Sequence, residues 1–521
     1  MNHNQTASKK VLTLFGFFAI TSSMVMTVYE YPTFATSKFS LVFFVILGGL
    51  CWFLPTALIS AEMASVEGWE DGGVFSWVGK ALGNRWGFAA IFFQWFQITV
   101  GFVTMDYFIV GSLSIIFDIP DINNVPWLKF ISVLIIFWAI TLVQFLGTKN
   151  TAKIAKWGFV IGIIVPSIVF FGFSIAYVLQ GNPLHMTFSV HDLIPDFSKL
   201  STLVVFTSFI LAFTGVEASA SHVNELKNAS RNYPLAVLIL VVLAIVLDTL
   251  GGLTVGSVIP EDQLTLNTGM ISSFKILVTH FDPRLIWLFR IMALLIVFGV
   301  VAEISSWVIG PSRGMYVAAQ KGLLPKSFTK TNKKGVPTTI IIVQGIVVTI
   351  WDAVLTFGGS SGNASFLAAI SLTVVIYLVC YLLMFIAYFV LIYKKQNLQR
   401  TYNVPGGKIG KTLVAIIGFA TSAFAFFISF VTPSSLSTSE GKTYQMVLIS
   451  SFIVAAIIPF IIYAFRHHFE ENKDYIPRHV DAQSANKFVR PAGRGEFLME
   501  NEDKQHEFQT KDEHQQKNKS N

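Results

Sequence analysis

The stretch that decides the fold is STLVVFTSFILAFTGVE, residues 201–217, which is apolar along most of its length. A helix needs about 20 such residues to cross the ~30 Å hydrocarbon layer of a bilayer. The run is interrupted at Thr214 and Gly215, and Glu217 follows directly. Because glycine weakens a helix and a charge inside a membrane is costly, the pattern predicts a membrane-spanning helix that breaks at a functional site.

Similar apolar runs recur from one end of the 521-residue chain to the other. The composition is 53% apolar and 13% charged, whereas a soluble globular domain is roughly 25% charged. The sequence therefore predicts an all-α integral membrane protein, embedded in a lipid bilayer, with about twelve transmembrane helices. The predicted spans are 11–33, 39–63, 86–116, 127–147, 156–179, 201–223, 234–258, 285–309, 337–357, 364–393, 411–431 and 445–465.

The basic residues are distributed unequally between the two sets of connections. Connections on the side of the N-terminus carry 20 Lys and Arg residues, against 7 on the opposite side. By the positive-inside rule, the N-terminal residues 1–10 and the tail after residue 465 both lie in the cytoplasm. The net charge of +7 follows this membrane pattern, so we expect no nucleic-acid partner. Lys9 and Lys10 precede a run without a convincing cleavage site, which favours a retained first helix over a signal peptide.

A second interruption lies in the first span, at Thr21, Ser22 and Ser23, five spans before the break at Gly215. Interrupted segments at corresponding positions indicate an inverted repeat whose half-helices bind the substrate. Small residues that only permit close helix packing are the alternative explanation. The predicted transporter domain, residues 11–465, divides into repeat one at 11–179, repeat two at 201–393 and two additional helices at 411–465.

An ionisable group inside a membrane span is costly and marks a functional site by default, and six carboxylates in the predicted spans are candidates. They are Glu30, Asp106, Glu217, Asp248, Glu303 and Asp352. Glu217 and Glu303 are the strongest candidates, because the first follows a helix break and the second precedes Trp307 by one turn. For Asp248 and Asp352 we expect instead hydrogen bonds to neighbouring helices.

Aromatic residues are placed beside these carboxylates. Glu303 and Trp307 share a helix face that can close over a substrate. Tyr377 and Tyr381 are also one turn apart, and two hydroxyls near the middle of a membrane need hydrogen-bond partners. A polar cavity in the membrane is therefore expected, although aromatic stripes more often serve packing.

The chemistry of an enzyme is not indicated. No metal-ligand cluster, HExxH motif or nucleophile elbow occurs near the predicted membrane core. Cys51 and Cys380 lie in apolar runs and are interpreted as small buried hydrophobic residues. We therefore expect no catalytic residues, no metal and no cofactor.

The run FTGVEASASHVNELKNASRNYP, from Phe213 to Pro234, resembles the sixth-span signature of the amino acid–polyamine–organocation superfamily. The signature positions are Gly215, Glu217, Glu225, Asn228, Arg231 and Pro234. Four further segments look like the bacterial glutamate/γ-aminobutyrate (GABA) antiporter family, and the similarity covers roughly residues 11–465. They are SMVMTVYEYPTFATS from Ser23, EDGGVFSWV from Glu70, AEISSWVIGPSRGMYVAAQ from Ala302 and TVVIYLVCY from Thr373. The first-span break lacks the Gly-rich form of the wider superfamily, as in the glutamate branch.

The resemblance implies a five-plus-five inverted repeat with broken helices 1 and 6, plus two additional helices. It implies an antiporter in the bacterial cell membrane that takes up extracellular glutamate and releases intracellular GABA. Such exchange supports acid resistance together with a soluble glutamate decarboxylase. Resemblance assigns the substrate path to Tyr29, Glu217, Glu303, Trp307, Tyr377 and Tyr381, to which the two breaks add Ser22, Ser23 and Gly215.

The polar tail, residues 466–521, holds five of the ten histidines and has a formal charge of −1 with neutral histidines. It is either an acid sensor or a solvated segment without a regulatory role. In the antiporter family a C-terminal segment plugs the cytoplasmic vestibule at neutral pH. FVRPAGRGEFLMEN, residues 488–501, resembles that plug, with Arg490 and Arg494 as anchors. The histidines lie on either side of this segment, which leaves its pH trigger open.

Two other functions are alternatives to glutamate/GABA exchange. One is an antiporter or proton symporter for another amino acid, for example an arginine/agmatine exchanger. The other is a membrane nutrient sensor, although the tail is short and polar for an output domain. Counterflow with labelled substrates would distinguish an exchanger for another amino acid from a glutamate/GABA exchanger. Failure to detect any solute flux would favour the nutrient sensor.

Overall fold

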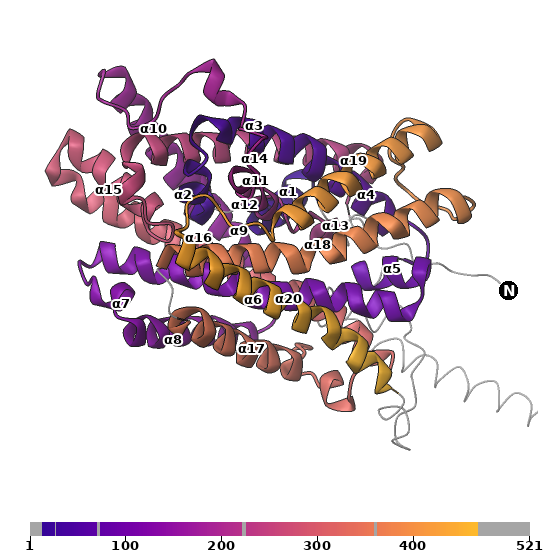
Figure 1. The fold of residues 1–521 in the computed structure, drawn as a ribbon. Helices are drawn as coiled ribbons and strands as arrows, with labels where there is room; N and C mark the ends of the chain where they lie inside the picture. Colours follow the sequence, from indigo (N-terminus) through magenta and orange to yellow (C-terminus); the bar gives the residue numbers. More distant parts are fainter. Residues whose placement is uncertain (1–12, 27, 70–72, 221–225, 359–361, 467–521) are drawn as a thin grey trace, which may run out of the picture. The chain divides into compact units, whose positions relative to one another are not determined.

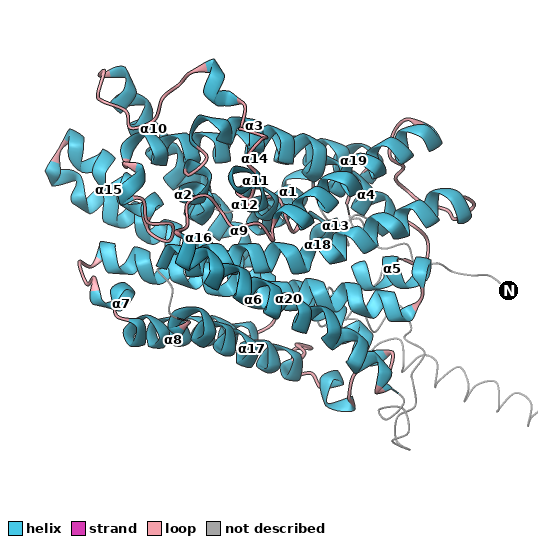
Figure 2. Ribbon diagram, in the orientation of Figure 1, coloured by secondary structure: helices cyan, strands magenta, loops and turns pink. Residues whose placement is uncertain are grey.

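The computed structural model describes residues 13–26, 28–69, 73–220, 226–358 and 362–466. These residues belong to one compact unit. They form helices joined by loops (Figure 2), and their only strand-like pairings are two isolated bridges, Val66–Arg400 and Thr331–Pro337.

The helices follow one another along the chain as labelled in Figure 1. Their bounds are α1 Leu14–Val25, α2 Tyr31–Ala35, α3 Leu41–Gly48, α4 Leu54–Ala64, α5 Val74–Leu82, α6 Asn84–Ile116, α7 Asp121–Asn124, α8 Pro126–Gln144, α9 Thr148–Trp157, α10 Val165–Leu179, α11 Leu200–Leu203, α12 Phe206–Ala212, α13 Val216–Ala220, α14 Ala229–Val258, α15 Gly269–Phe281, α16 Ile286–Gln320, α17 Thr338–Phe357, α18 Gly362–Lys394, α19 Gly407–Ile428 and α20 Thr438–Ala464. Short π-helical segments at Gly49–Phe53 and Gly158–Ile164 join α3 to α4 and α9 to α10.

Eleven helical stretches of the described residues are long and apolar enough to cross a membrane. They correspond to the predicted spans two to twelve, with ends that differ by several residues. The predicted first span, 11–33, is α1, a 3₁₀ turn at Val28–Glu30 and α2, and each piece is too short to span alone. The prediction of an all-helical membrane protein is confirmed.

The two predicted helix breaks are present, but one lies further along than predicted. The sixth span breaks between α12 and α13, and Gly215 takes the positive φ of +108° that glycine adopts most readily. The first span does not break at Thr21 to Ser23. Thr21 bonds back to the Phe17 carbonyl at 3.0 Å, and the Met26 amide bonds to the Ser22 carbonyl, so the helix continues until Val25.

Some helices differ from the apolar pattern. The predicted eighth span ends at residue 309, whereas α16 continues to Gln320 across Pro311. The proline lacks the amide that would bond to the Trp307 carbonyl, yet the helix continues, and the adjacent Ser312 Oγ bonds to the Val308 carbonyl at 2.7 Å. The short helices α5 and α15 were not predicted, since neither is long enough to span a bilayer.

The helices α6 and α18 pack against each other at the centre of the bundle. The most apolar 18-residue stretch of α6 is 89% buried, whereas that of α20 is 17% buried, so α20 is peripheral. Further out, α8 and α17 lie side by side (Figure 1). Because α18 also contacts α12 and α6 also contacts α16, the break before α13 is enclosed by the most buried helices.

Candidate functional site

The carboxylate of Glu217 is the centre of the site. It lies in the first turn of α13, directly after the break, and its side chain is buried. One oxygen accepts a hydrogen bond from Gln94 Nε2 of α6 at 2.9 Å and another from the Tyr377 hydroxyl. The other oxygen accepts from the Tyr381 hydroxyl at 2.7 Å. All three donors are neutral, and no Lys or Arg among the described residues forms an ion pair with Glu217.

The two tyrosines are held in place by aromatic contacts. Their ring centres are 4.5 Å apart, and Trp52 of the π-helical segment stands edge-on to Tyr381 at 4.8 Å. The indole of Trp52 is itself fixed by a 2.9 Å hydrogen bond to Ser422 of α19. The predicted orientation of Tyr377 and Tyr381, with both hydroxyls on one side and both bonded, is confirmed.

Trp307 of α16 connects the two helix breaks. Its Nε1 donates to the carbonyl of Met24, near the end of α1, at 3.2 Å. A Cβ at Gly215 would lie 2.8 Å from the ring of Trp307, so only glycine fits beside this indole. The Gly215 amide also donates to the Tyr381 hydroxyl at 3.4 Å. Both breaks are therefore in contact with one aromatic side chain.

A small cavity lies beside these breaks. Its volume of ≈ 10 Å³ is about the space that one water molecule needs. Of the predicted site residues, Tyr29, Glu303 and Trp307 line it. The full lining is Met24, Tyr29, Gln97, Ile98, Gly101, Met105, Leu211, Thr214, Glu303, Trp307 and Thr373.

Comparison with known proteins identifies the fold family. The family model described as amino acid permease matches residues 12–452. The chain belongs to the amino acid permease family.

Two relatives cover almost the whole permease. The glutamate/gamma-aminobutyrate antiporters of Lactococcus lactis subsp. lactis (strain IL1403) and subsp. cremoris (strain MG1363) are each 60% identical to it. In both cases the match covers 94% of this chain and 97% of the relative. A probable agmatine/putrescine antiporter of the IL1403 strain is 24% identical, over 68% of this chain and 74% of its own length. The permease is thus a membrane transporter rather than an enzyme.

The permease buries three further carboxylates without hydrogen-bond donors among the described residues, and two of them are glutamates. Both oxygens of Glu303 and both of Glu30 lack a partner. A buried charge without partners costs several kcal/mol or more, so such a group needs a proton or a ligand cation. Of these carboxylates, Glu303 lines the cavity.

Other predicted residues lie away from the cavity of the permease. Ser22 and Ser23 are buried in α1 but are not among the residues that line it. Asp106 is buried in α6 with both oxygens unpartnered among the described residues. These three contribute to the surroundings rather than to the cavity surface.

The expected hydrogen bond of Asp352 to a neighbouring helix is wrong. Asp352 accepts a bond at 3.0 Å from Thr356, one turn along its own helix α17. Thr356 then connects to α6 through Tyr107 at 2.6 Å, so the neighbouring helix is reached only indirectly. Asp248 is buried in α14, and its bond to a neighbouring helix stays a prediction.

Sequence reasoning missed the amides of the third span. Gln94 bonds both Glu217 and the Tyr377 hydroxyl, the latter at 3.3 Å, and Gln97 lines the cavity. The signal was present in FFQWFQ, residues 92–97, because polar side chains inside a span are as informative as charged ones.

Several expectations fall outside the described residues. These are the signature residue Glu225, the plug anchors Arg490 and Arg494, and the tail histidines His467, His468, His479, His506 and His514. Within the described ranges, no cluster of three or more His, Cys, Asp or Glu side chains could hold a metal ion.

Proposed function

We propose that this permease exchanges extracellular glutamate for intracellular GABA across the bacterial cell membrane. The observation that carries the proposal is its 60% identity, over 94% of the chain, to relatives named glutamate/gamma-aminobutyrate antiporters. The agmatine/putrescine relative is far more distant at 24% identity, which counts against an arginine/agmatine exchanger.

The site chemistry fits substrates that carry an ammonium group. Glu217 is buried and surrounded by neutral donors, so its negative charge lacks a counterion within the described residues. Glutamate and GABA both carry an ammonium group that supplies this charge. We assign Glu217, Tyr377 and Tyr381 to ammonium binding, and Glu303, Tyr29 and Trp307 to closing the path around the substrate.

The break residues complete the proposed site. Gly215 allows the indole of Trp307 to approach the backbone, and Ser22 and Ser23 precede the first break. Unwound backbone at paired breaks offers free amides and carbonyls to a zwitterionic substrate. Movement of Trp307 away from Met24 would enlarge the cavity.

The proposed topology has both termini in the cytoplasm, supported by the 20 to 7 distribution of Lys and Arg residues. In this arrangement the tail after residue 465, including Arg490 and Arg494, lies where it can plug the cytoplasmic vestibule. The proposed domain division is the transporter domain, residues 11–465, and this cytoplasmic tail.

The exchange is proposed to work best in acid. A free glutamate side chain has a pKa of about 4.3, so only about one in 500 carries the extra proton at pH 7. Uptake of net-neutral glutamate and release of GABA carrying one positive charge would export charge in each cycle. A soluble glutamate decarboxylase, which consumes one proton per turnover, would then help the cell resist acid.

Labelled-glutamate uptake into proteoliposomes preloaded with GABA tests this function. Uptake should require internal GABA, rise between about pH 7.5 and pH 4.5, and move net charge. A chain lacking residues 473–521 should retain exchange at neutral pH if the tail is the plug. Uptake driven by agmatine but not by GABA would contradict the proposed substrates, and undiminished electroneutral exchange at about pH 8 would contradict the mechanism.

A further inference from the structure

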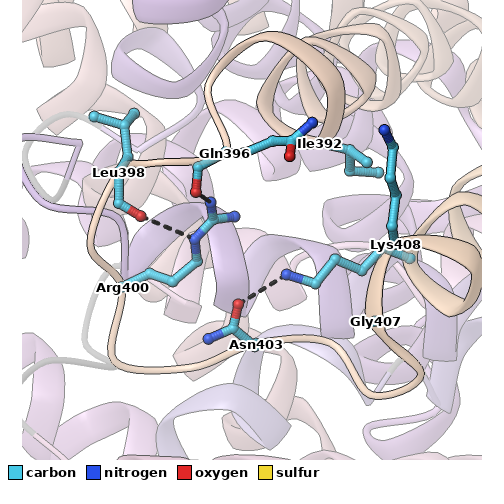
Figure 3. Close-up of a pocket in the computed structure, with 8 residues that line it drawn as sticks. Ile392, Gln396, Leu398, Arg400, Asn403, Gly407 and Lys408 are labelled. Atoms are coloured by element: carbon cyan, nitrogen blue, oxygen red, sulfur yellow. Dashed lines mark hydrogen bonds between the residues drawn. The ribbon is translucent and has the colours of Figure 1, made fainter.

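A second cavity lies far along the chain from the proposed substrate site, between the end of α18 and the start of α19 (Figure 3). Its volume is ≈ 380 Å³, many times that of the cavity at the helix breaks. It is lined by Ile392, Gln396, Leu398, Arg400, Asn403, Gly407, Lys408 and Lys411. Three of these residues are cationic and none is acidic.

The loop that forms this basic cleft is held rigidly by Arg400. Its guanidinium bonds the carbonyls of Leu398 at 3.2 Å and Gln396 at 3.0 Å (Figure 3). It also forms a 2.5 Å ion pair with the buried carboxylate of Glu62 in α4. Most donors of Arg400 are thus committed to the protein, and the cleft is formed in advance of any ligand.

The charge of the cleft is not neutralised by this arrangement. Glu62 also receives Lys411 Nζ at 2.6 Å, so one carboxylate faces the two cations Arg400 and Lys411. Lys408 adds a third cation without a carboxylate partner among the described residues. The basic cleft therefore has a surplus of positive charge and suits an anion.

Lys408 is the donor available to that anion. Its ammonium lies 4.5 Å from the centre of the Tyr393 ring, and it donates no hydrogen bond to another described residue. Lys411 has one ammonium proton beyond those given to Glu62 and Asn403. These two lysines are one turn of α19 or less apart, so both can contact one phosphate group.

Exposed apolar side chains begin next to Lys408 and continue along α19. Ile409, Leu413 and Ile416 of α19 are 84%, 56% and 51% exposed, at a spacing that places them on one face. Because α19 is long and apolar enough to span a membrane, lipid chains are the surroundings expected for this exposed face. A ligand at the cleft can therefore have a charged head and an apolar body.

We propose that the basic cleft binds the phosphate group of an anionic phospholipid, whose acyl chains lie along Ile409, Leu413 and Ile416. The cleft belongs to the connection that is rich in Lys and Arg, which the positive-inside rule places at the cytoplasmic surface. Anionic headgroups attract basic groups at that surface. The proposal does not depend on which solutes the permease exchanges.

The test uses the purified full-length chain in a neutral detergent. Phosphatidylglycerol retention is counted by native mass spectrometry, and the rise in Tm with added lipid gives an apparent affinity. Phosphatidylcholine and inorganic phosphate are titrated in parallel. We expect phosphatidylglycerol alone to be retained and to raise Tm, with about fivefold weaker affinity in Lys408→Gln and little change in Lys408→Arg.

The matched control is Lys330→Gln, an exposed lysine in another basic connection, which should bind phosphatidylglycerol like the unmodified chain. Equal affinity in Lys408→Gln and Lys330→Gln would overturn the site. A Tm rise of the same size with inorganic phosphate alone would overturn the lipid assignment. Lys408 is exposed, so its substitution should leave the fold intact, which the Tm without lipid verifies.

Discussion

Two buried glutamates in this permease have opposite surroundings. Glu62, at one end of α4, accepts from Arg400, Lys411, the Tyr388 hydroxyl and the Val404 amide. Glu217, beside the helix break, accepts only from the neutral groups of Gln94, Tyr377 and Tyr381. Both side chains are almost completely buried.

The difference separates a structural carboxylate, Glu62, from one that we propose to bind substrate, Glu217. The protein supplies Glu62 with two cations, so its charge is compensated at all times and it fixes α4 to the loop before α19. Glu217 has hydrogen bonds that orient it but no cation among the described residues. A buried carboxylate of this kind gains most from a ligand that brings its own positive charge.

The largest expected effect is a loss of stability on substitution of Glu62. Glu62→Gln leaves Arg400 and Lys411 without their carboxylate, and we expect a loss of about 3 kcal/mol in stability. The value is at the lower end for a broken buried pair, because both cations retain some contact with solvent. Thermal unfolding in detergent measures it.

The control for this change is Glu261→Gln, which removes an exposed pair with Lys38 and should cost less than about 1 kcal/mol. Exchange per folded molecule should change little in either variant. If Glu62→Gln is as stable as Glu261→Gln, the contrast between the two buried glutamates fails.

The second largest effect is expected on exchange, when Glu217 is substituted. Glu217→Gln keeps the shape of the side chain but removes the charge that the substrate ammonium would contact. We expect exchange in proteoliposomes to fall about 100-fold, the value for losing one strong charged contact. A smaller loss of stability should accompany it, because the amide cannot accept all three hydrogen bonds. Exchange that persists at the level of Glu261→Gln would remove Glu217 from the substrate site.

A smaller effect is expected where the two breaks meet. Trp307→Phe removes the hydrogen bond to the Met24 carbonyl and part of the ring that covers Gly215. One neutral hydrogen bond and its packing are worth about 1–1.5 kcal/mol, so exchange should fall roughly tenfold. The matched control is Trp287→Phe at the other end of α16, where the indole is 58% exposed and exchange should be unaffected. Equal rates in the two variants would argue against gating by Trp307.

The sequence predicted those parts of this comparison that depend on local patterns. Apolar runs located the spans, and a glycine followed by a glutamate located the sixth-span break. The spacing of Tyr377 and Tyr381 was enough to place both hydroxyls on one side. In each case the information lies within a single span.

The parts that were missed depend on contacts between distant segments. Arg400 and Glu62 are 338 residues apart, and no sequence pattern near either residue predicts their ion pair. The first break lies after Val25 rather than at Thr21, because hydroxyls can bond to their own helix without ending it. A small polar residue does not break a helix when its hydroxyl can bond to a carbonyl of the preceding helical turn.

The smallest effect is expected at a third carboxylate, which has cations but no burial. Asp118, in the loop after α6, pairs with Lys275 at 3.2 Å and Arg290 at 2.9 Å, and more than half of its side chain is exposed. The hydrogen bond and charge of Lys275, aided by Arg290, lower the pKa of Asp118 below its ordinary value. A lowered pKa means that the pair stabilises the fold above the ordinary pKa of aspartate and that this contribution is lost as the pH falls through the lowered one.

Asp118→Asn should therefore lower Tm slightly at about pH 7, and the difference from the unmodified chain should shrink towards about pH 3 and at high salt. Measuring Tm of both chains at several pH values cancels the titration of all other groups. Since solvent screens this pair, a Tm loss as large as that of Glu62→Gln would show that burial is not what distinguishes the carboxylates. The ranking of Glu62 above Asp118 is thus the sharpest check that burial together with cationic partners, rather than cationic partners alone, makes a carboxylate structural.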